Sequence, residues 1–132
     1  MSRLAAHALL AAAALTAVTL FVPGLAGHTR AAERGEAVFK QYCAICHSPD
    51  PGHNKIGPSL AGVVGRKAGS VPDFSYSSAN KGSGIVWTRA KLDAYLTNPQ
   101  AVVPGTAMLF PGIKDADKRH ALIDYLAGLP AS

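Results

Sequence analysis

The chain has 132 residues, a formal net charge of +5 and only two cysteines. That length allows one domain but not two. Two cysteines cannot form a tetrahedral structural zinc site by themselves, and the sequence has no second cluster of Cys and His at ligand spacing. A thioredoxin-like redox pair would stand near a βαβ pattern, and the sequence shows no strands alternating with helices.

The N-terminal residues have the features of a targeting segment. Arg3 supplies a positive charge, residues 9–22 form an uncharged apolar run, and Gly24 and Ala26 occupy A-x-A-like positions for cleavage. We therefore predict a signal peptide over residues 1–26.

The domain that follows this segment is predicted to span residues 27–132. An uncleaved anchor is the alternative, because the uncharged run over residues 7–26 approaches the roughly 20 residues that a spanning helix needs. Pro23 and the following glycine close a short apolar run, which favours cleavage. In either case the domain is exported.

A first helix is predicted to start near Glu33, after a short flexible lead over residues 28–32. Its predicted buried stripe consists of residues at helical spacing: Gly35, Val38, Phe39, Tyr42, Cys43 and Cys46.

Gly35 is unusual because it stands inside this predicted helix. A glycine there costs about 1 kcal/mol relative to alanine, so it usually marks a close approach. The expected neighbour is the C-terminal helix, with Leu122 and Tyr125. An accidental glycine near a frayed helix end is the alternative.

The segment Cys43-Ala44-Ile45-Cys46-His47 carries the strongest chemical signal of the chain. C-x-x-C-H is the attachment pattern of c-type haem. On a helical turn, positions i and i+3 share a face, so both thiols can reach two vinyl groups on one porphyrin edge. We therefore predict one covalent haem c on Cys43 and Cys46, with His47 as the proximal iron ligand. Together with the targeting segment, this attachment indicates the bacterial periplasm.

Residues 48–83 are rich in Gly, Pro, Ser and Asn and poor in periodic apolar runs. A loop of this length normally argues against a compact domain. A large, flat, apolar haem resolves the conflict, because loops can wrap around it as a core. We expect short helical turns, one near residues 77–81, and no sheet.

A second helix is predicted to begin at Thr88, a favourable N-cap residue, and to end at Asn98-Pro99. Its buried stripe would consist of Leu92, Tyr95 and Leu96. Residues 99–113 are predicted to form a second loop.

The third predicted helix runs from about Asp115 to Ala127. Asp115 can cap its start, and Gly128 followed by Pro130 marks its end. The residues on its predicted buried face are Ala121, Leu122, Tyr125 and Leu126.

From about Gly35 to Leu129 the chain resembles the class I cytochromes c, the mitochondrial and soluble bacterial type. Beyond the C-x-x-C-H pattern, the resemblance is carried by these segments: residues 57–60 (GPSL), 65–67 (GRK), 74–76 (FSY), Asn80, Trp87, 95–96 (YL), 98–99 (NP), 104–110 (PGTAMLF) and 122–126 (LIDYL). The resemblance implies an all-α cytochrome c fold. Its N- and C-terminal helices pack across each other, and loops wrap a covalent haem.

The resemblance also implies which residues surround the cofactor. Met108 would be the distal iron ligand, and the Pro58 carbonyl would accept a hydrogen bond from His47, which orients that ligand. Groups around the inner haem propionate would be Arg66, Tyr76 and Trp87. Tyr95, Asn80 and Thr106 would form a polar network beside the methionine sulfur, and Phe110 would cover the haem edge.

Without the resemblance, Met108 would read as an ordinary core side chain in a loop. Met1 is the only other methionine, so the exported domain has no second candidate. Ligation by His and Met raises the haem potential and suits electron transfer.

The implied function is that of a periplasmic one-electron carrier, not an enzyme. Expected donors are a quinol-oxidising membrane complex or a periplasmic dehydrogenase; expected acceptors are a terminal oxidase or a photosynthetic reaction centre. We expect a monomer that binds redox proteins, associates transiently with the membrane surface and does not bind nucleic acid. The rival functions are a small haem peroxidase and a haem gas sensor. Both require an open distal position, which Met108 argues against.

The surface charges depart from those of the family, whose members usually carry a ring of lysines around the exposed haem edge. Gln100 and Ala107 are neutral, and Asp115 and Asp117 follow Lys114. We therefore expect partner reduction to depend less on salt than in strongly basic members. His53 and His120 are expected to be surface histidines without a ligand role.

Overall fold

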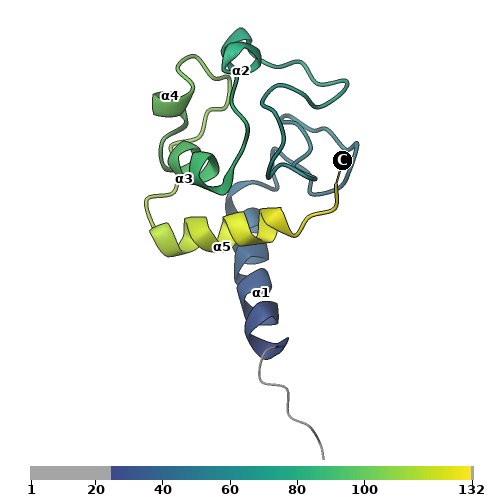
Figure 1. Ribbon diagram of the computed structural model, residues 1–132, viewed down its shortest axis with the longest axis vertical. Coiled ribbons are helices and arrows are strands. Elements are labelled where there is room, and N and C mark those ends of the chain that lie inside the picture. Colours follow the sequence, from purple (N-terminus) through teal and green to yellow (C-terminus); the bar gives the residue numbers. More distant parts are fainter. Residues whose placement is uncertain (1–24, 132) are drawn as a thin grey trace, which may run out of the picture.

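The computed structural model describes residues 25–131, and Figure 1 shows helices joined by long loops. The helices are α1 (Leu25–Tyr42), α2 (Ser78–Gly82), α3 (Arg89–Thr97), α4 (Pro99–Val102) and α5 (Ala116–Ala127). Within the described residues the only β pairing is an isolated bridge between Lys67 and Val86. The predicted all-α class is therefore confirmed.

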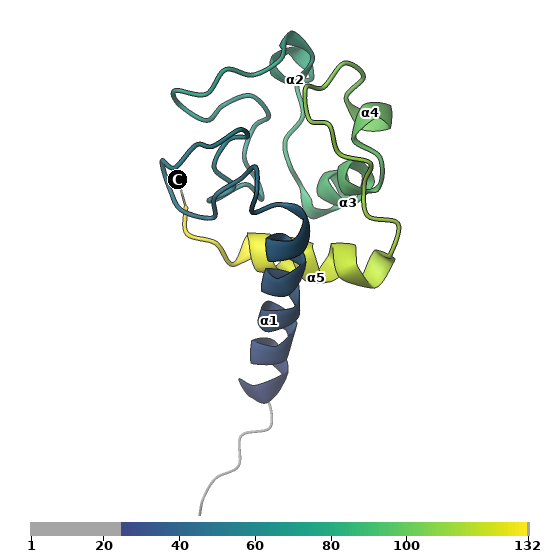
Figure 2. The same ribbon diagram turned by 180° about the vertical axis from the view of Figure 1, so that it is seen from behind.

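The helices α1 and α5 cross and pack against each other, as the two views in Figures 1 and 2 show. Gly35 is buried at this crossing. A Cβ atom on Gly35 would overlap the Ala121 carbonyl oxygen and would lie 2.5 Å from the Cβ of Tyr125. The prediction that Gly35 marks a close approach to the C-terminal helix is confirmed.

The predicted start of the first helix is wrong. α1 begins at Leu25, so residues 28–32 are helical and do not form a flexible lead. Side chains 30–34 are exposed, and buried periodicity therefore could not reveal this part of the helix. It consists mainly of Ala, Arg and Glu, which have high helix propensity. The predicted signal peptide lies outside the described residues, except for its last two residues. In the described part of the chain, no helix is both long and apolar enough to cross a membrane.

The remaining helices begin at capping residues. Thr88 caps α3 by accepting a hydrogen bond of 3.2 Å from the amide of Lys91, as predicted. Asp115 caps α5 by accepting from the amides of Asp117 and Lys118. The turn near residues 77–81 is the short helix α2, whose N-cap is Ser77.

The helix α4 corrects the prediction that residues 99–113 form a loop. Asn98 ends α3 and at the same time caps α4, where its side chain accepts from the amide of Ala101. Pro99 follows at the first helical position, where its missing N–H costs nothing. The Asn-Pro pair therefore separates two helices and does not end helical structure.

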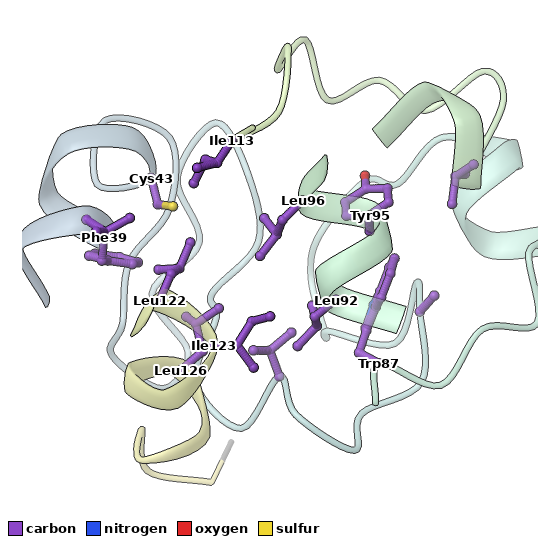
Figure 3. Packing of buried hydrophobic residues seen from close by; sticks show 14 residues of the cluster. Phe39, Cys43, Trp87, Leu92, Tyr95, Leu96, Ile113, Leu122, Ile123 and Leu126 are labelled. Carbon is purple, nitrogen blue, oxygen red and sulfur yellow. The ribbon is translucent and has the colours of Figure 1, made fainter. Parts of the chain in front are cut away.

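The core forms where α5 packs against α1 on one side and against α3 on the other (Figure 3). Leu122 of α5 is completely buried, next to Phe39 of α1 and to Cys43, which follows α1. Phe39 and Tyr125 hold α1 against α5 with a ring-centroid distance of 5.5 Å. This packing fixes the end of α1, where the two cysteines follow.

Candidate haem-binding site

The two cysteines and the histidine occupy one helical turn that continues directly from α1. The amide of Cys43 donates to the Phe39 carbonyl at 2.8 Å, and the amide of His47 donates to the Cys43 carbonyl at 2.9 Å. The two cysteines are not joined in a disulfide. The structure therefore offers two thiols and an imidazole on one turn, which is the arrangement that the spacing predicts.

The Cys43 thiol lies in the protein interior. Burial, and to a lesser degree the neighbouring Cys46, raises its pKa to about 12. The group therefore stays uncharged near neutral pH, which suits contact with the apolar edge of a porphyrin. Cys46 is half-buried on the same turn.

The His47 imidazole is fixed by one hydrogen bond to the backbone. Its Nδ1 lies 2.8 Å from the Pro58 carbonyl oxygen. Because a carbonyl can only accept, Nδ1 carries the proton and Nε2 is the nitrogen that can bind a metal. Burial lowers the pKa of His47, and the bond to Pro58 opposes that effect. The ring is thus held neutral and oriented, as a metal ligand must be.

Gly57 forms the backing of this imidazole. Its amide donates to the Cys46 carbonyl at 2.7 Å, so the loop lies against the cysteine turn. A Cβ atom at this position would lie 2.6 Å from Nδ1 and 2.8 Å from Nε2 of His47. Only glycine leaves room for the ring beside this backbone.

Met108 lies in a small hydrogen-bonded network with two of the other predicted site residues. The hydroxyls of Tyr95 and Thr106 share a hydrogen bond of 3.1 Å, and the Thr106 hydroxyl accepts from the Met108 amide at 3.3 Å. The Tyr95 hydroxyl also lies 3.9 Å from the Met108 sulfur. Burial raises the pKa of Tyr95, so it remains a neutral donor. The structure thus brings Tyr95, Thr106 and Met108 together.

The predicted propionate-binding side chains have backbone partners of their own. Arg66 donates to the carbonyls of Ala61 at 2.6 Å and Ser59 at 2.9 Å, and burial lowers its pKa. The Tyr76 hydroxyl accepts from the Val71 amide at 3.3 Å. Their approach to a propionate stays a prediction.

Aromatic contacts position the two remaining rings of the predicted site. Trp87 lies beside Tyr95, with ring centroids 4.7 Å apart, and Phe110 meets Tyr42 edge-on at 6.3 Å. Tyr42 directly precedes Cys43, so Phe110 links the segment of Met108 to the cysteine turn. The assignment of Phe110 to the haem edge remains a prediction.

The donor set fits a covalent haem and does not fit a bare metal ion. Among the described residues, no cluster of three or more His, Cys, Asp or Glu side chains could hold a metal. A metal bound through His47 therefore needs most of its ligands from a cofactor. Among the residues that the structure describes, the Asn80 Oδ1 atom is a buried oxygen without a hydrogen-bond partner. Such a group is costly unless a bound ligand supplies a donor.

Two further residues shape the site and were missed in the sequence. Asn54 joins two loops, because its Nδ2 donates to the Pro72 carbonyl at 3.1 Å and its Oδ1 accepts from the Ser59 amide at 3.0 Å. Lys55 donates from Nζ to the Ala44 carbonyl inside the cysteine turn. No periodic pattern marks such residues, since their partners are backbone groups of irregular loops. His53 and His120 are exposed, as expected.

Comparison with known proteins agrees with this geometry. Residues 32–130 match the sequence profile of the family described as Cytochrome c. Cytochrome c type-1 of Ascaris suum is 53% identical over 94 residues, which cover 71% of this chain and 84% of that protein. Cytochrome c2 of Blastochloris viridis is 50% identical over 96 residues, which cover 72% and 75%. The structure of cytochrome cH from Methylobacterium extorquens superposes with a TM-score of 0.67 at 44% identity, over 72% of this chain and 95% of that one.

The room that Gly57 leaves for the imidazole generates a test of the histidine side of the site. We expect Gly57→Ala to lower the free energy of unfolding of the haem-loaded protein by about 1–3 kcal/mol, because the added methyl displaces a ring that Pro58 holds. The same substitution should reduce the low-spin fraction in the ferric spectrum. Guanidinium titration and visible spectroscopy measure the two effects. The control is Gly82→Ala, where a Cβ atom meets nothing within 4 Å. Equal behaviour of the two variants would contradict the assignment.

Proposed function

We propose that this chain is a periplasmic one-electron carrier. It belongs to the cytochrome c family and is therefore an electron-transfer protein with covalently attached haem c, not an enzyme. Donors would be a quinol-oxidising complex or a dehydrogenase, and acceptors a terminal oxidase or a photosynthetic reaction centre. Similarity to bacterial cytochromes c2 supports this proposal.

Within this proposal the chain's own residues hold and shield the cofactor, whose iron takes up and releases one electron when bound. Cys43 and Cys46 would form the two thioether bonds, and His47 and Met108 would bind the iron. The remaining proposed cofactor contacts are those of Pro58, Arg66, Tyr76, Asn80, Trp87, Tyr95, Thr106 and Phe110.

The placement of Met108 favours an electron carrier over a peroxidase or a gas sensor. Met108 has its amide bound to Thr106 and its sulfur beside the Tyr95 hydroxyl, so it is not a loosely placed loop side chain. A thioether bound to the iron suits electron transfer, because Met/His ligation raises the potential. A peroxidase or a gas sensor would need that position open.

Absorption spectroscopy with Met108→Ala tests this assignment. The parent protein should show low-spin ferric haem with a sulfur–iron charge-transfer band, and its reduced form should bind CO slowly. The variant should lose the band, and its reduction potential should fall, because the thioether that favours the ferrous state is gone. High-spin iron and rapid CO binding in the parent would support a peroxidase or a sensor. An unchanged potential in Met108→Ala would exclude Met108 as the ligand.

The periplasmic location rests on the apolar run over residues 9–22 and on the covalent haem. We expect the signal peptide, residues 1–26, to be removed on export. Mass spectrometry of the mature protein from a bacterial host should therefore give a mass that lacks this segment. Retention of residues 1–26 together with membrane-bound haem would support the alternative, a membrane-tethered carrier.

We propose that apolar side chains, more than charged ones, form the surface that contacts an electron partner. Large apolar side chains flank the proposed ligands on the surface: Ile45 between the two cysteines is 78% exposed, and Leu109 after Met108 is 94% exposed. Ala107, on the other side of Met108, is exposed and neutral. Lys55 donates its ammonium group to the Ala44 carbonyl. Ile45, Ala107 and Leu109 would therefore lie in the proposed contact with an electron partner.

The second-order rate of partner reduction should therefore depend weakly on ionic strength. We expect a fall of less than about tenfold from low to high salt, the lower end of what electrostatic steering supplies. Stopped-flow kinetics with an acidic redox partner measures this slope. Ala107→Lys, which adds a charge beside Met108, should steepen it. A steep slope in the parent would overturn the prediction, and an unchanged slope in Ala107→Lys would show that the partner does not contact the surface beside Met108.

A further inference from the structure

The segment that carries Met108, residues 103–115, contains no helix, and we call it the methionine segment. Its inner side is held by Thr106 and Tyr95, as described above. An irregular segment opens easily unless its backbone groups are bound, because local unfolding starts where exposed hydrogen bonds predominate. The two ends of this segment are bound by side chains that have no assigned role so far.

The N-terminal end is held by Gln100 of α4. Its Nε2 donates to the Thr106 carbonyl at 3.1 Å, and its Oε1 accepts from the Gly105 amide at 3.3 Å. One planar side-chain amide thus binds a backbone N–H and a backbone carbonyl of the turn that precedes Met108. Gly105 has a φ of +83°, a left-handed conformation that this pair of bonds fixes.

The C-terminal end is held by Arg119 of α5. Its Nη1 donates to the carbonyls of Ile113 and Lys114, each at 3.0 Å, and its Nε donates to Asp93 Oδ1 of α3 at 2.8 Å. Arg119 is 8% exposed, so these bonds are shielded from water. The planar fork of arginine donates in several directions from one rigid group, which lysine cannot do.

Both side chains therefore connect the methionine segment to helices that take part in the packed body of the molecule. Ile113 also donates its amide to the Leu96 carbonyl at 2.8 Å, which places the end of the segment against α3. With both ends bound, an opening of the backbone that would carry Met108 away requires bonds at one end of the segment to break.

We propose that Gln100 and Arg119 are positioning residues that clamp the methionine segment at its two ends and keep the Met108 sulfur in place against competing ligands. This inference rests on the proposed role of Met108 as an iron ligand. Neither residue touches the cofactor in this proposal. The clamp keeps small molecules from the distal position, and it thereby separates a carrier from a peroxidase or a sensor.

Added imidazole is the probe for this clamp, because it competes with the Met108 sulfur in the ferric haem-loaded protein. Gln100→Ala should increase the affinity for imidazole about threefold, because it removes the bonds of an exposed side chain. Arg119→Lys should increase it about tenfold, because it removes bonds of a buried side chain. Arg119→Lys keeps the charge near Asp93 and so avoids the larger disruption expected from alanine. Absorption titrations measure both affinities.

Arg89→Ala is the matched control for a general loss of stability. It removes an ion pair with Asp124 that also joins α3 to α5, but this pair is exposed and binds no backbone group of the methionine segment. Its imidazole affinity should equal that of the parent. If all three variants shift affinity in proportion to their loss of unfolding free energy, the clamp is wrong and the effect is global.

The same substitutions in a Met108→Ala background separate the clamp from the ligand assignment. Without the sulfur, Gln100→Ala and Arg119→Lys should no longer change imidazole affinity, because nothing is left to displace. If Met108→Ala alone fails to raise affinity, the proposed ligand is wrong. If Met108→Ala raises affinity but the two clamp variants in the parent do not, only the clamp is wrong.

Discussion

The contact between Gly35 of α1 and the Ala121 carbonyl of α5 is the constraint on which the remaining structure depends. Only a glycine allows the two backbones to approach this closely, and the approach buries Leu122 and Phe39 between the helices. Because the cysteine turn continues from the end of α1, its direction is set by the same crossing. The position of both thiols and of His47 thus follows from a contact eight residues before Cys43, through a rigid helix.

Beyond this crossing, the loops are ordered by side chains that bind backbone groups. In a helix or sheet, main-chain donors and acceptors satisfy one another, and an irregular loop must find other partners. Asn54, Arg66, Gln100 and Arg119 each supply two or more such bonds to loop backbone. Arginine and amide side chains suit this role because each offers several polar atoms in a fixed plane. The loops can therefore surround a cofactor without a sheet or long helices.

How much the sequence predicts depends on whether a residue's partner lies nearby in the chain or in a periodic pattern. Thr88 and Asp115 cap their helices as expected, because capping is local. The approach of Gly35 to the C-terminal helix is predictable because both elements have clear apolar stripes. The early start of α1 is not predictable from burial, because helix propensity alone extends the helix there. The roles of Gln100 and Arg119 cannot be read from the sequence, since their partners are loop carbonyls and amides whose positions only the folded chain defines. The cofactor contacts of Arg66, Tyr76 and Phe110 remain predictions carried by the resemblance.

The methionine segment carries both a proposed iron ligand, Met108, and an exposed side chain proposed to contact partners, Leu109. The Phe110 amide donates to the Met108 carbonyl at 3.0 Å, which makes a three-residue turn with Leu109 at its apex. Met108 and Phe110 are half-buried on either side, while Leu109 is 94% exposed. The same bond therefore turns the proposed ligand inward and its neighbour outward. A clamp on both ends of the segment would fix not only the sulfur but also the apolar side chain that a partner meets. In this proposal, ligand retention and partner contact depend on the same backbone conformation.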